Sequence, residues 1–208
     1  MKYKGIIFDL DGVICFTDKY HYLAWKRLAD KLGIYFDETI NNRLRGVSRM
    51  ESLEIILEKS TKKYSKEEKE DFAEQKNKMY VELLEDMTPA DLPKEVKTTL
   101  DDLRKQGVLL AIGSSSKNAK RILKHLGLEN YFDAISDGTN ITKSKPDPEV
   151  FLKAAEYLQL EPQECLVVED AVAGIKAATA GGFDSAGLGE ASECEMTTYP
   201  LSGFAELR

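Results

Sequence analysis

A short apolar run near the amino terminus ends abruptly in two carboxylates, and this feature constrains the fold more than any other. The run covers residues 6–8, and Asp9, Asp11 and Gly12 follow within four positions. A continuous apolar run is typical of a strand that is buried on both faces in a parallel sheet. Open α/β sheets bind their ligands at the carboxyl ends of such strands. The sequence therefore predicts a parallel sheet with acidic groups at its ligand-binding edge.

The carboxylates of Asp9 and Asp11 need a positive partner if they point to the same side. The two-residue period of a strand places them so, and like charges at that distance repel. A bound Mg²⁺ relieves the repulsion, because it takes one or two protein carboxylates together with water and phosphate oxygens. A strand that simply ends in an Asp-Gly turn is the alternative. Partners at other strand ends decide between the two interpretations.

The composition favours a globular protein that binds neither nucleic acid nor a membrane. The 208 residues are 42% hydrophobic, enough for a sizeable core, and the net charge of -7 argues against a general nucleic-acid binder. Three scattered cysteines, Cys15, Cys165 and Cys194, predict neither a disulfide framework nor a zinc site. The sequence shows no signal peptide and no apolar stretch of membrane-spanning length. We expect a cytoplasmic monomer whose partner is a small molecule.

A helical segment interrupts the chain after the first strand. Its first helix is expected at residues 18–32, and a short second helix follows Asp37. Ser48 and Ser65 each precede a glutamate by three positions, and these capping boxes predict two more helices, the last reaching about residue 85. Two prolines then break the pattern. We expect a helical domain at residues 17–90.

The remaining chain alternates helix and strand, which is typical of a parallel sheet with right-handed crossovers. Asp147 is the expected N-cap of one of these helices, with Pro148 at its first position. The stretch after residue 189 shows no pattern. The predicted fold is therefore α/β, a Rossmann-like parallel-sheet core at residues 1–16 and 91–208 with the inserted helical domain. Its later strands are expected at 108–112, 132–135, 165–168 and 183–188.

Two further strand ends carry polar side chains. The strand at 108–112 runs into a serine-rich loop and a helix, whose N–H groups and hydroxyls either seat a phosphate or only cap the helix. The strand at 165–168 ends in Glu169 and Asp170, at the edge where Asp9 and Asp11 lie. Four acids that converge there imply a cation, because buried acids are costly unless paired or metal-bound. Lys145 either reaches the same site or is an ordinary solvated loop lysine.

Lys76 breaks the pattern of the long helix at residues 66–85. It falls on the apolar stripe that contains Phe72, Tyr80 and Leu83. Either its aliphatic stem lies along the edge of the stripe with the ammonium in water, or the ammonium is placed for an anion. The spacing alone favours the first interpretation.

Together these motifs resemble the four ordered motifs of the haloacid dehalogenase superfamily of phosphotransferases, over the chain up to about residue 189. The helical segment resembles the α-helical cap of that superfamily. Within it, the chain is most similar to mutases that convert β-glucose 1-phosphate to glucose 6-phosphate. The motifs are Asp9 to Val13, Ser114, Lys145-Pro146 and Glu169-Asp170, and the mutase-like stretches lie at 17–26, 46–49, 76–77, 114–118 and 144–146.

The resemblance implies a role for each motif. Asp9 would be the nucleophile and Asp11 the general acid and base. Ser114 and Lys145 would stabilise the transferred phosphoryl group, while Thr17 and His21 would assist Asp11. Mg²⁺ would be bound by Asp9, the backbone carbonyl of Asp11 and Asp170, with Glu169 in or near its shell. The residues implied for the sugar and its distal phosphate are Trp25, Gly46, Val47, Ser48, Arg49, Ser52, Lys76, Ser115, Ser116, Lys117 and Asn118, although Trp25 is explained as well by packing.

Two alternatives to a phosphomutase stay open at the level of sequence. A phosphatase of small sugar phosphates would use the same nucleophile, acid and metal, whereas Arg49, Lys76 and His21 favour the mutase. A non-catalytic binding protein could keep the same fold. The intact set of Asp9, Asp11, Lys145 and Asp170 argues against that second alternative.

Overall fold

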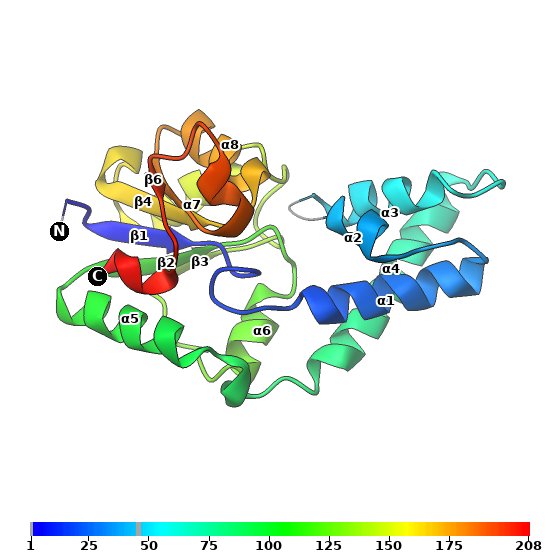
Figure 1. Ribbon diagram of the computed structural model, residues 1–208, viewed down its shortest axis with the longest axis horizontal. Coiled ribbons are helices and arrows are strands. Elements are labelled where there is room, and N and C mark those ends of the chain that lie inside the picture. The colour runs from blue at the N-terminus through cyan, green and yellow to red at the C-terminus, as the bar shows by residue number, and fades with distance from the viewer. Residues whose placement is uncertain (1, 45–46) are drawn as a thin grey trace. The chain divides into compact units, whose positions relative to one another are not determined.

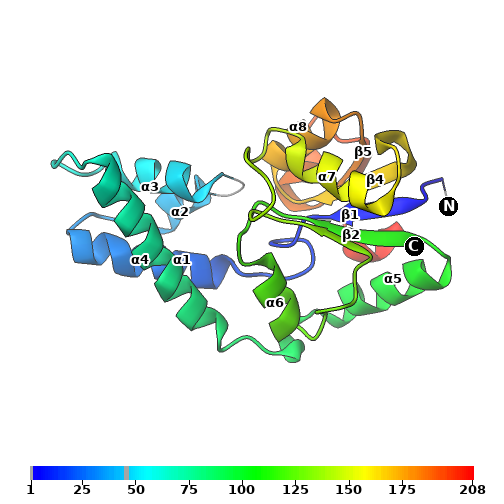
Figure 2. The same ribbon diagram turned by 180° about the vertical axis from the view of Figure 1, so that it is seen from behind.

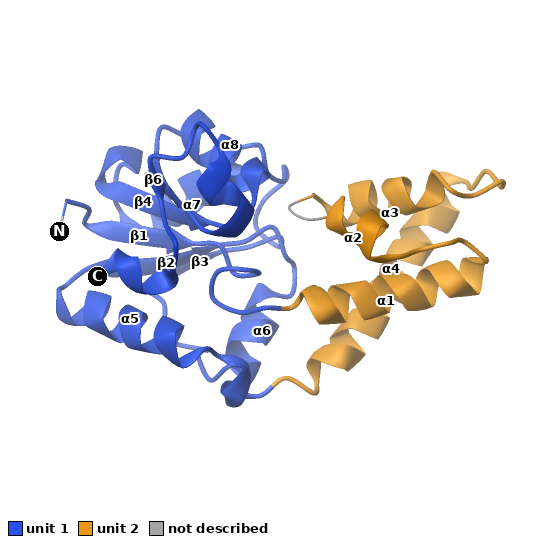
Figure 3. Ribbon diagram, in the orientation of Figure 1, with its two compact units in different colours: residues 1–16, 88–208 blue, residues 17–87 orange. Residues whose placement is uncertain are grey.

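The structure is a computed structural model that describes residues 2–44 and 47–208. The chain forms two compact units, residues 1–16 with 88–208 (unit 1) and residues 17–87 (unit 2), coloured separately in Figure 3. The divisions fall at 16/17 and 87/88, and the 3₁₀ turn η1 (Pro89–Asp91) lies in unit 1.

Unit 1 is built on a six-stranded sheet in the order β3-β2-β1-β4-β5-β6, in which every neighbouring pair is parallel. Because β1 pairs with β2 on one side and β4 on the other, the chain reverses its winding at β1, where ligands of open α/β sheets bind. The predicted apolar run of β1 is fully buried. The strands are β1 (Gly5–Phe8), β2 (Leu109–Gly113), β3 (Ala134–Ser136), β4 (Cys165–Glu169), β5 (Asp184–Gly187) and β6 (Tyr199–Pro200).

Helices cover both faces of this sheet, as Figures 1 and 2 show. On one side lie α5 (Lys94–Lys105) and α6 (Ala119–His125), and on the other α7 (Glu149–Leu158) and α8 (Val172–Ala180). The core beneath α7 and α8 includes Ile7, Phe151 and Val167. The predicted Rossmann-like fold is therefore confirmed.

Two details of unit 1 differ from the prediction. Helix α7 begins at Glu149 with Pro148 as its N-cap, one residue later than expected, and Asp147 Oδ1 accepts the N–H of Glu149 at 3.0 Å. The stretch after residue 189, which had no readable pattern, contains the short 3₁₀ turns η3 (Gly189–Glu193) and η4 (Phe204–Leu207) and strand β6. A two-residue edge strand is too short to show any periodicity. A further 3₁₀ turn, η2 (Pro162–Glu164), precedes β4.

Unit 2 is a bundle of four helices, as predicted from the caps. Helix α1 ends at Gly33, which adopts the left-handed conformation (φ 68°) that favours glycine, and both predicted capping boxes are present at Ser48 and Ser65. The bundle buries a core that includes Trp25 and Leu53. Its helices are α1 (Asp18–Leu32), α2 (Glu38–Asn42), α3 (Arg49–Leu57) and α4 (Lys66–Leu84). Across the described residues of both units, every helix is too short or too polar to cross a membrane.

Candidate functional site

The carboxyl ends of β1 and β4 bring three carboxylates together in unit 1. Oxygen atoms of Asp9, Glu169 and Asp170 all lie within 4.8 Å of one another. Asp9 directly follows β1, and its N–H donates to the carbonyl of Val168 on β4 at 2.9 Å. Asp9 and Glu169 are buried, at 8% and 1% exposure. We call these three residues the acidic cluster.

Lys145 is the buried cation of this cluster. Its Nζ donates to Asp9 Oδ1 and to Glu169 Oε1, each at 2.5 Å, and lies 4.7 Å from the centre of the Phe151 ring. The interpretation as a solvated loop lysine is therefore wrong. Burial alone lowers the pKa of Lys145, but the charges of Asp9 and Glu169 outweigh it and raise that pKa. Burial also raises the pKa of Asp9 well above its ordinary value, and the charge of Lys145 offsets this only in part.

The donor set of the acidic cluster fits a hard divalent cation. The two buried carboxylates, of Asp9 and Glu169, share one ammonium, and carboxylate oxygens are the ligands that Mg²⁺ and Ca²⁺ prefer. The carboxylate of Asp11 is not among the three that converge. Strand β1 ends at Phe8, so Asp11 lies in a turn and its side chain is not placed by the strand period.

The turn after β1 requires a glycine at position 12. Its φ of +89° lies in the left-handed region, so the predicted turn is present. A Cβ atom on Gly12 would lie 2.0 Å from Asp170 Oδ2. The turn after β1 therefore packs directly against the second acidic pair, and the turn and the acidic cluster are parts of one arrangement rather than alternatives.

The serine loop after β2 is held together by its own hydroxyl groups. The N–H of Ser116 donates to Ser114 Oγ, and the N–H of Asn118 donates to Ser116 Oγ, both at 3.2 Å. These two N–H groups, which one of the two interpretations makes available to a phosphate, are therefore used inside the loop. Ser114 is buried beside β3, where its N–H donates to the carbonyl of Ser136, and Ser115 Oγ makes no hydrogen bond within the described structure. Lys117 is exposed.

Unit 2 carries a second polar cluster, centred on Lys76 of α4. Lys76 is 3% exposed, and its Nζ lies 2.8 Å from His21 Nδ1 and 4.7 and 4.6 Å from the ring centres of Trp25 and Tyr80. The interpretation of Lys76 as a stem with its ammonium in water is therefore wrong. An ammonium only donates, so His21 Nδ1 is the acceptor and the ring proton resides on Nε2. Trp25 packs in the core of unit 2, as the packing interpretation of this residue predicts, and its ring also faces the ammonium of Lys76.

The other predicted substrate residues of unit 2 lie around the start of α3. Arg49 Nη2 donates to Asn77 Oδ1 at 2.9 Å, and burial lowers the pKa of this guanidinium. Ser48 is engaged in the capping box, Ser52 is buried, and Val47 is partly buried. Gly46 lies outside the described residues.

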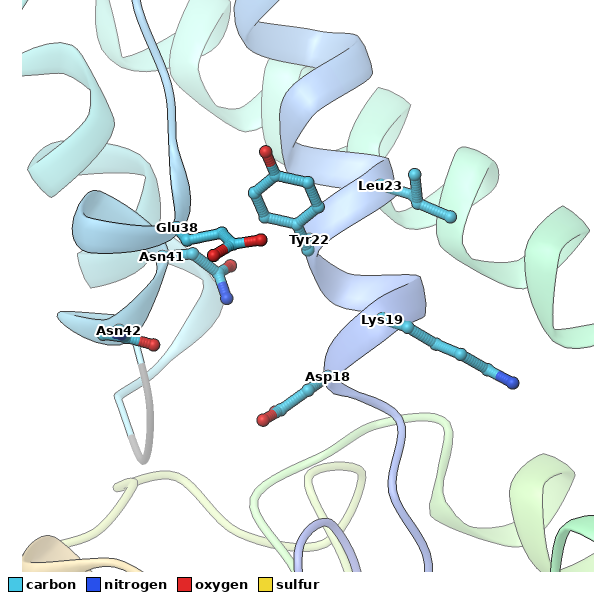
Figure 4. A pocket seen from close by; sticks show the side chains of 7 residues that line it. All are labelled: Asp18, Lys19, Tyr22, Leu23, Glu38, Asn41 and Asn42. Carbon is cyan, nitrogen blue, oxygen red and sulfur yellow. The ribbon is translucent and has the colours of Figure 1, made fainter.

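Unit 2 also has a hollow of about 440 Å³ that the sequence did not indicate (Figure 4). It lies between the first turns of α1 and helix α2. None of the residues predicted to bind substrate lines it. The lining residues are Asp18, Lys19, Tyr22, Leu23, Glu38, Asn41 and Asn42.

Burial, reinforced by the charges of Lys76 and Arg49, lowers the pKa of His21 well below 6.5. Near pH 6 the imidazole of His21 therefore binds a proton in the unfolded chain but not in the folded protein. The free energy of unfolding should then fall as the pH drops below about 6.5, by at most about 1.4 kcal/mol per pH unit. His21→Gln should remove this contribution, and urea unfolding between about pH 7.5 and 5.5 measures it. His125→Gln keeps His21 and is the control. An unchanged slope in the His21 variant would contradict the prediction.

The chain is similar over most of its length to known proteins of one family. The family model for haloacid dehalogenase-like hydrolases matches residues 3–182. The chain belongs to this family. A β-phosphoglucomutase of Bacillus subtilis is 43% identical over 189 residues, 90% of this chain and 84% of that protein. A phosphorylated carbohydrates phosphatase of Thermotoga maritima is 32% identical over 87% of this chain and 82% of that protein.

Solved structures of the haloacid dehalogenase-like family agree with the fold. The crystal structure of a β-phosphoglucomutase from Clostridium difficile matches with a TM-score of 0.92 and 41% identity, covering 99% of this chain and 93% of that one. The resemblance that the sequence motifs indicated is therefore confirmed over both units. The helical unit 2 corresponds to the cap of this family.

Proposed function

We propose that the protein is a β-phosphoglucomutase, which interconverts β-glucose 1-phosphate and glucose 6-phosphate through β-glucose 1,6-bisphosphate. The observation that carries the proposal is the 43% identity to the Bacillus subtilis enzyme, which extends over 90% of this chain. The acidic cluster supports it, since a buried lysine holds one carboxylate at the end of the central strand. We also propose that the enzyme works as a cytoplasmic monomer.

The nucleophile of the proposed reaction is Asp9. When Asp9 carries the phosphoryl group, the C6 hydroxyl of β-glucose 1-phosphate attacks its phosphorus atom. The bond between phosphorus and Asp9 breaks, and Asp11 accepts the proton of the hydroxyl. The bisphosphate formed then turns around and donates its C1 phosphoryl group to Asp9. Asp11 returns the proton to the C1 oxygen, and glucose 6-phosphate is released. One hard displacement is thereby divided into two easier ones.

The groups around Asp9 stabilise charge on the transferred phosphoryl group. Lys145 is fixed by its two ion pairs, so its ammonium is already in place when a phosphate arrives. Ser114, buried at the end of β2, is the proposed second donor. Mg²⁺, bound by Asp9, the backbone carbonyl of Asp11 and Asp170 with Glu169 beside it, would offset the repulsion between nucleophile and phosphate.

A mutase must also bind the distal phosphate and the sugar, and the remaining predicted residues are proposed for this task. Arg49 has a planar guanidinium that binds phosphate bidentately. Thr17 and His21 are proposed to assist Asp11. The rest of the proposed substrate-binding set is Trp25, Gly46, Val47, Ser48, Ser52, Lys76, Ser115, Ser116, Lys117 and Asn118.

Removing Arg49 should damage mutase activity more than simple hydrolysis. Arg49→Ala should lower kcat/KM for the bisphosphate by about 10- to 100-fold, because charge-assisted hydrogen bonds contribute roughly 1.5–3 kcal/mol. Hydrolysis of a small aryl phosphate, which has no distal phosphate, should change little. Arg43→Ala is the matched control, since Arg43 is an exposed arginine of unit 2 that pairs with Glu58. Equal losses on both substrates would reject the role of Arg49.

A chelator should abolish turnover, and added Mg²⁺ should restore it. Because Mg²⁺ should bind the acidic cluster of the folded protein and not the unfolded chain, the melting temperature should rise with the Mg²⁺ concentration. Asp170→Asn removes one of the three carboxylates and should suppress that rise. Full activity in excess chelator, or an undiminished rise in the variant, would refute the cluster as the metal site.

The decisive experiment is phosphorus NMR of the protein with Mg²⁺, β-glucose 1-phosphate and a trace of the 1,6-bisphosphate. Formation of glucose 6-phosphate without matching inorganic phosphate would support the mutase. Inorganic phosphate as the main product would instead make the protein a sugar-phosphate phosphatase, the second candidate, which the similarity to the Thermotoga maritima phosphatase favours. No change in either signal would reject both.

A further inference from the structure

Gly174 stands where the local sequence of α8 would favour alanine. It is the third residue of the helix and is buried, in a stretch that contains Ala173, Ala177 and Ala178. Glycine is disfavoured in helices relative to alanine because it loses more backbone entropy. The chain thus uses alanine at other small positions of α8 and a poorer helix former here. Departures from local preference of this kind mark functional or tightly constrained positions.

The space beside Gly174 is filled by one side chain, that of Glu169. A Cβ atom built on Gly174 would lie 1.9 Å from Glu169 Oε1, 2.0 Å from Cδ and 2.5 Å from Cγ. These are its three nearest heavy atoms, and all of them belong to the same glutamate. Packing against a neighbouring helix therefore does not explain the glycine, because the contact is with the acidic cluster.

The side chain of Glu169 cannot move away from position 174 without losing its hydrogen-bond partners. Its Oε1 accepts from Lys145 Nζ at 2.5 Å, and its Oε2 accepts the N–H groups of Asp170 and Ala171 at 2.9 and 3.0 Å. Both oxygens are thus fixed, one by the buried cation and the other by the residues that lead into α8. A methyl group at position 174 must either push Oε1 away from Lys145 or move the start of α8.

We propose that Gly174 is a positioning residue of the acidic cluster. Its missing side chain provides the space in which Glu169 binds Lys145 while remaining beside Asp9 and Asp170. Gly174 touches neither substrate nor reacting atoms, and it acts through Glu169. The steric part of this inference stands on the contacts alone, and only its consequence for Mg²⁺ rests on the proposed function.

The test compares Gly174→Ala with a matched glycine of the same segment. Gly181 follows the last residue of α8, and a Cβ there would lie 2.7 Å from the Phe183 ring, a milder crowding that involves no atom of the acidic cluster. Isothermal titration with Mg²⁺ alone measures the metal affinity of each variant. Gly174→Ala should weaken Mg²⁺ binding by at least about tenfold, as changes behind metal ligands commonly do, and Gly181→Ala should leave it unchanged.

The second part of the test repeats the Gly174→Ala substitution in a protein in which Glu169 is replaced by the shorter aspartate. Glu169→Asp withdraws the carboxylate from position 174, so adding Gly174→Ala in that background should change Mg²⁺ affinity by less than about twofold. The same pair of substitutions is measured by urea unfolding in excess chelator. There the loss of stability caused by Gly174→Ala should be much smaller in the Glu169→Asp protein than in the wild type. A purely helical role of Gly174 would give equal losses in both backgrounds.

The outcomes separate the inference from the proposed function. Wild-type-like Mg²⁺ binding by Gly174→Ala, or losses that simply add in the double variant, would overturn the inference. If Gly174→Ala does not fold, recovery of the fold in the double variant supports the inference and failure to recover overturns it. If the wild-type protein binds no Mg²⁺, the metal part of the proposed function fails, and the metal-free unfolding measurements still decide the role of Gly174.

Discussion

Replacing Asp9 with asparagine is expected to reduce turnover by at least about 10⁴-fold, since an amide cannot form the aspartyl phosphate on which the proposed reaction depends. The fold should survive the change. Asparagine has nearly the same shape, and after the substitution the ammonium of Lys145 still has the carboxylate of Glu169 as its partner. Burial raises the pKa of Asp9, because desolvation disfavours its ionised form. The free energy of unfolding in chelator should therefore not decrease appreciably.

Two measurements check this prediction. Steady-state assays give turnover, and acid quenching after exposure to the bisphosphate should trap a phosphorylated protein in the wild type and none in Asp9→Asn. Asp184→Asn is the matched control, because Asp184 lies at the opposite, amino end of its strand and pairs with exposed Lys2. More than about 1% residual turnover in Asp9→Asn would show that another group is the nucleophile.

The features of the fold that the sequence predicted are those set by local chemistry. The apolar run of β1 and the capping boxes at Ser48 and Ser65 each act within a few residues of the chain. The sequence also predicted that the carboxyl ends of the strands lie at one edge of the sheet, because a parallel sheet brings these ends together whatever the connecting segments are. That argument was sufficient to bring Asp9 together with Glu169 and Asp170.

The features that were not predicted depend on contacts between distant segments. The buried position of Lys76 depends not only on Tyr80 of the same helix but also on His21 and Trp25 of α1, and spacing along α4 contains no information about these two. Lys145 was likewise indistinguishable from a solvated loop lysine by spacing alone. Strand β6 was missed because two residues have no period. Gly174 did leave a signal, a glycine among the alanines of α8, but its cause lies in Glu169.

Replacing Lys145 with methionine is expected to destabilise the protein by about 3–5 kcal/mol near neutral pH, because it leaves buried carboxylates without their cation. Methionine keeps most of the length and apolar volume of lysine, so the loss reports on charge rather than on a cavity. Lys143→Met is the control. That side chain is 70% exposed and pairs with Asp147, so its replacement should change stability by no more than about 0.5 kcal/mol.

The pH dependence distinguishes an electrostatic loss from a packing loss. Without Lys145, the pKa of Asp9, already raised by burial, rises further, so the folded protein binds a proton more tightly than the unfolded chain does. Stability relative to the wild type should then recover as the pH is lowered and the buried carboxylate is neutralised. Urea unfolding in chelator at about pH 8 and about pH 5.5 should show the larger deficit at the higher pH. An equal deficit at both values would mean that Lys145 stabilises the protein by packing on Phe151 rather than by its charge.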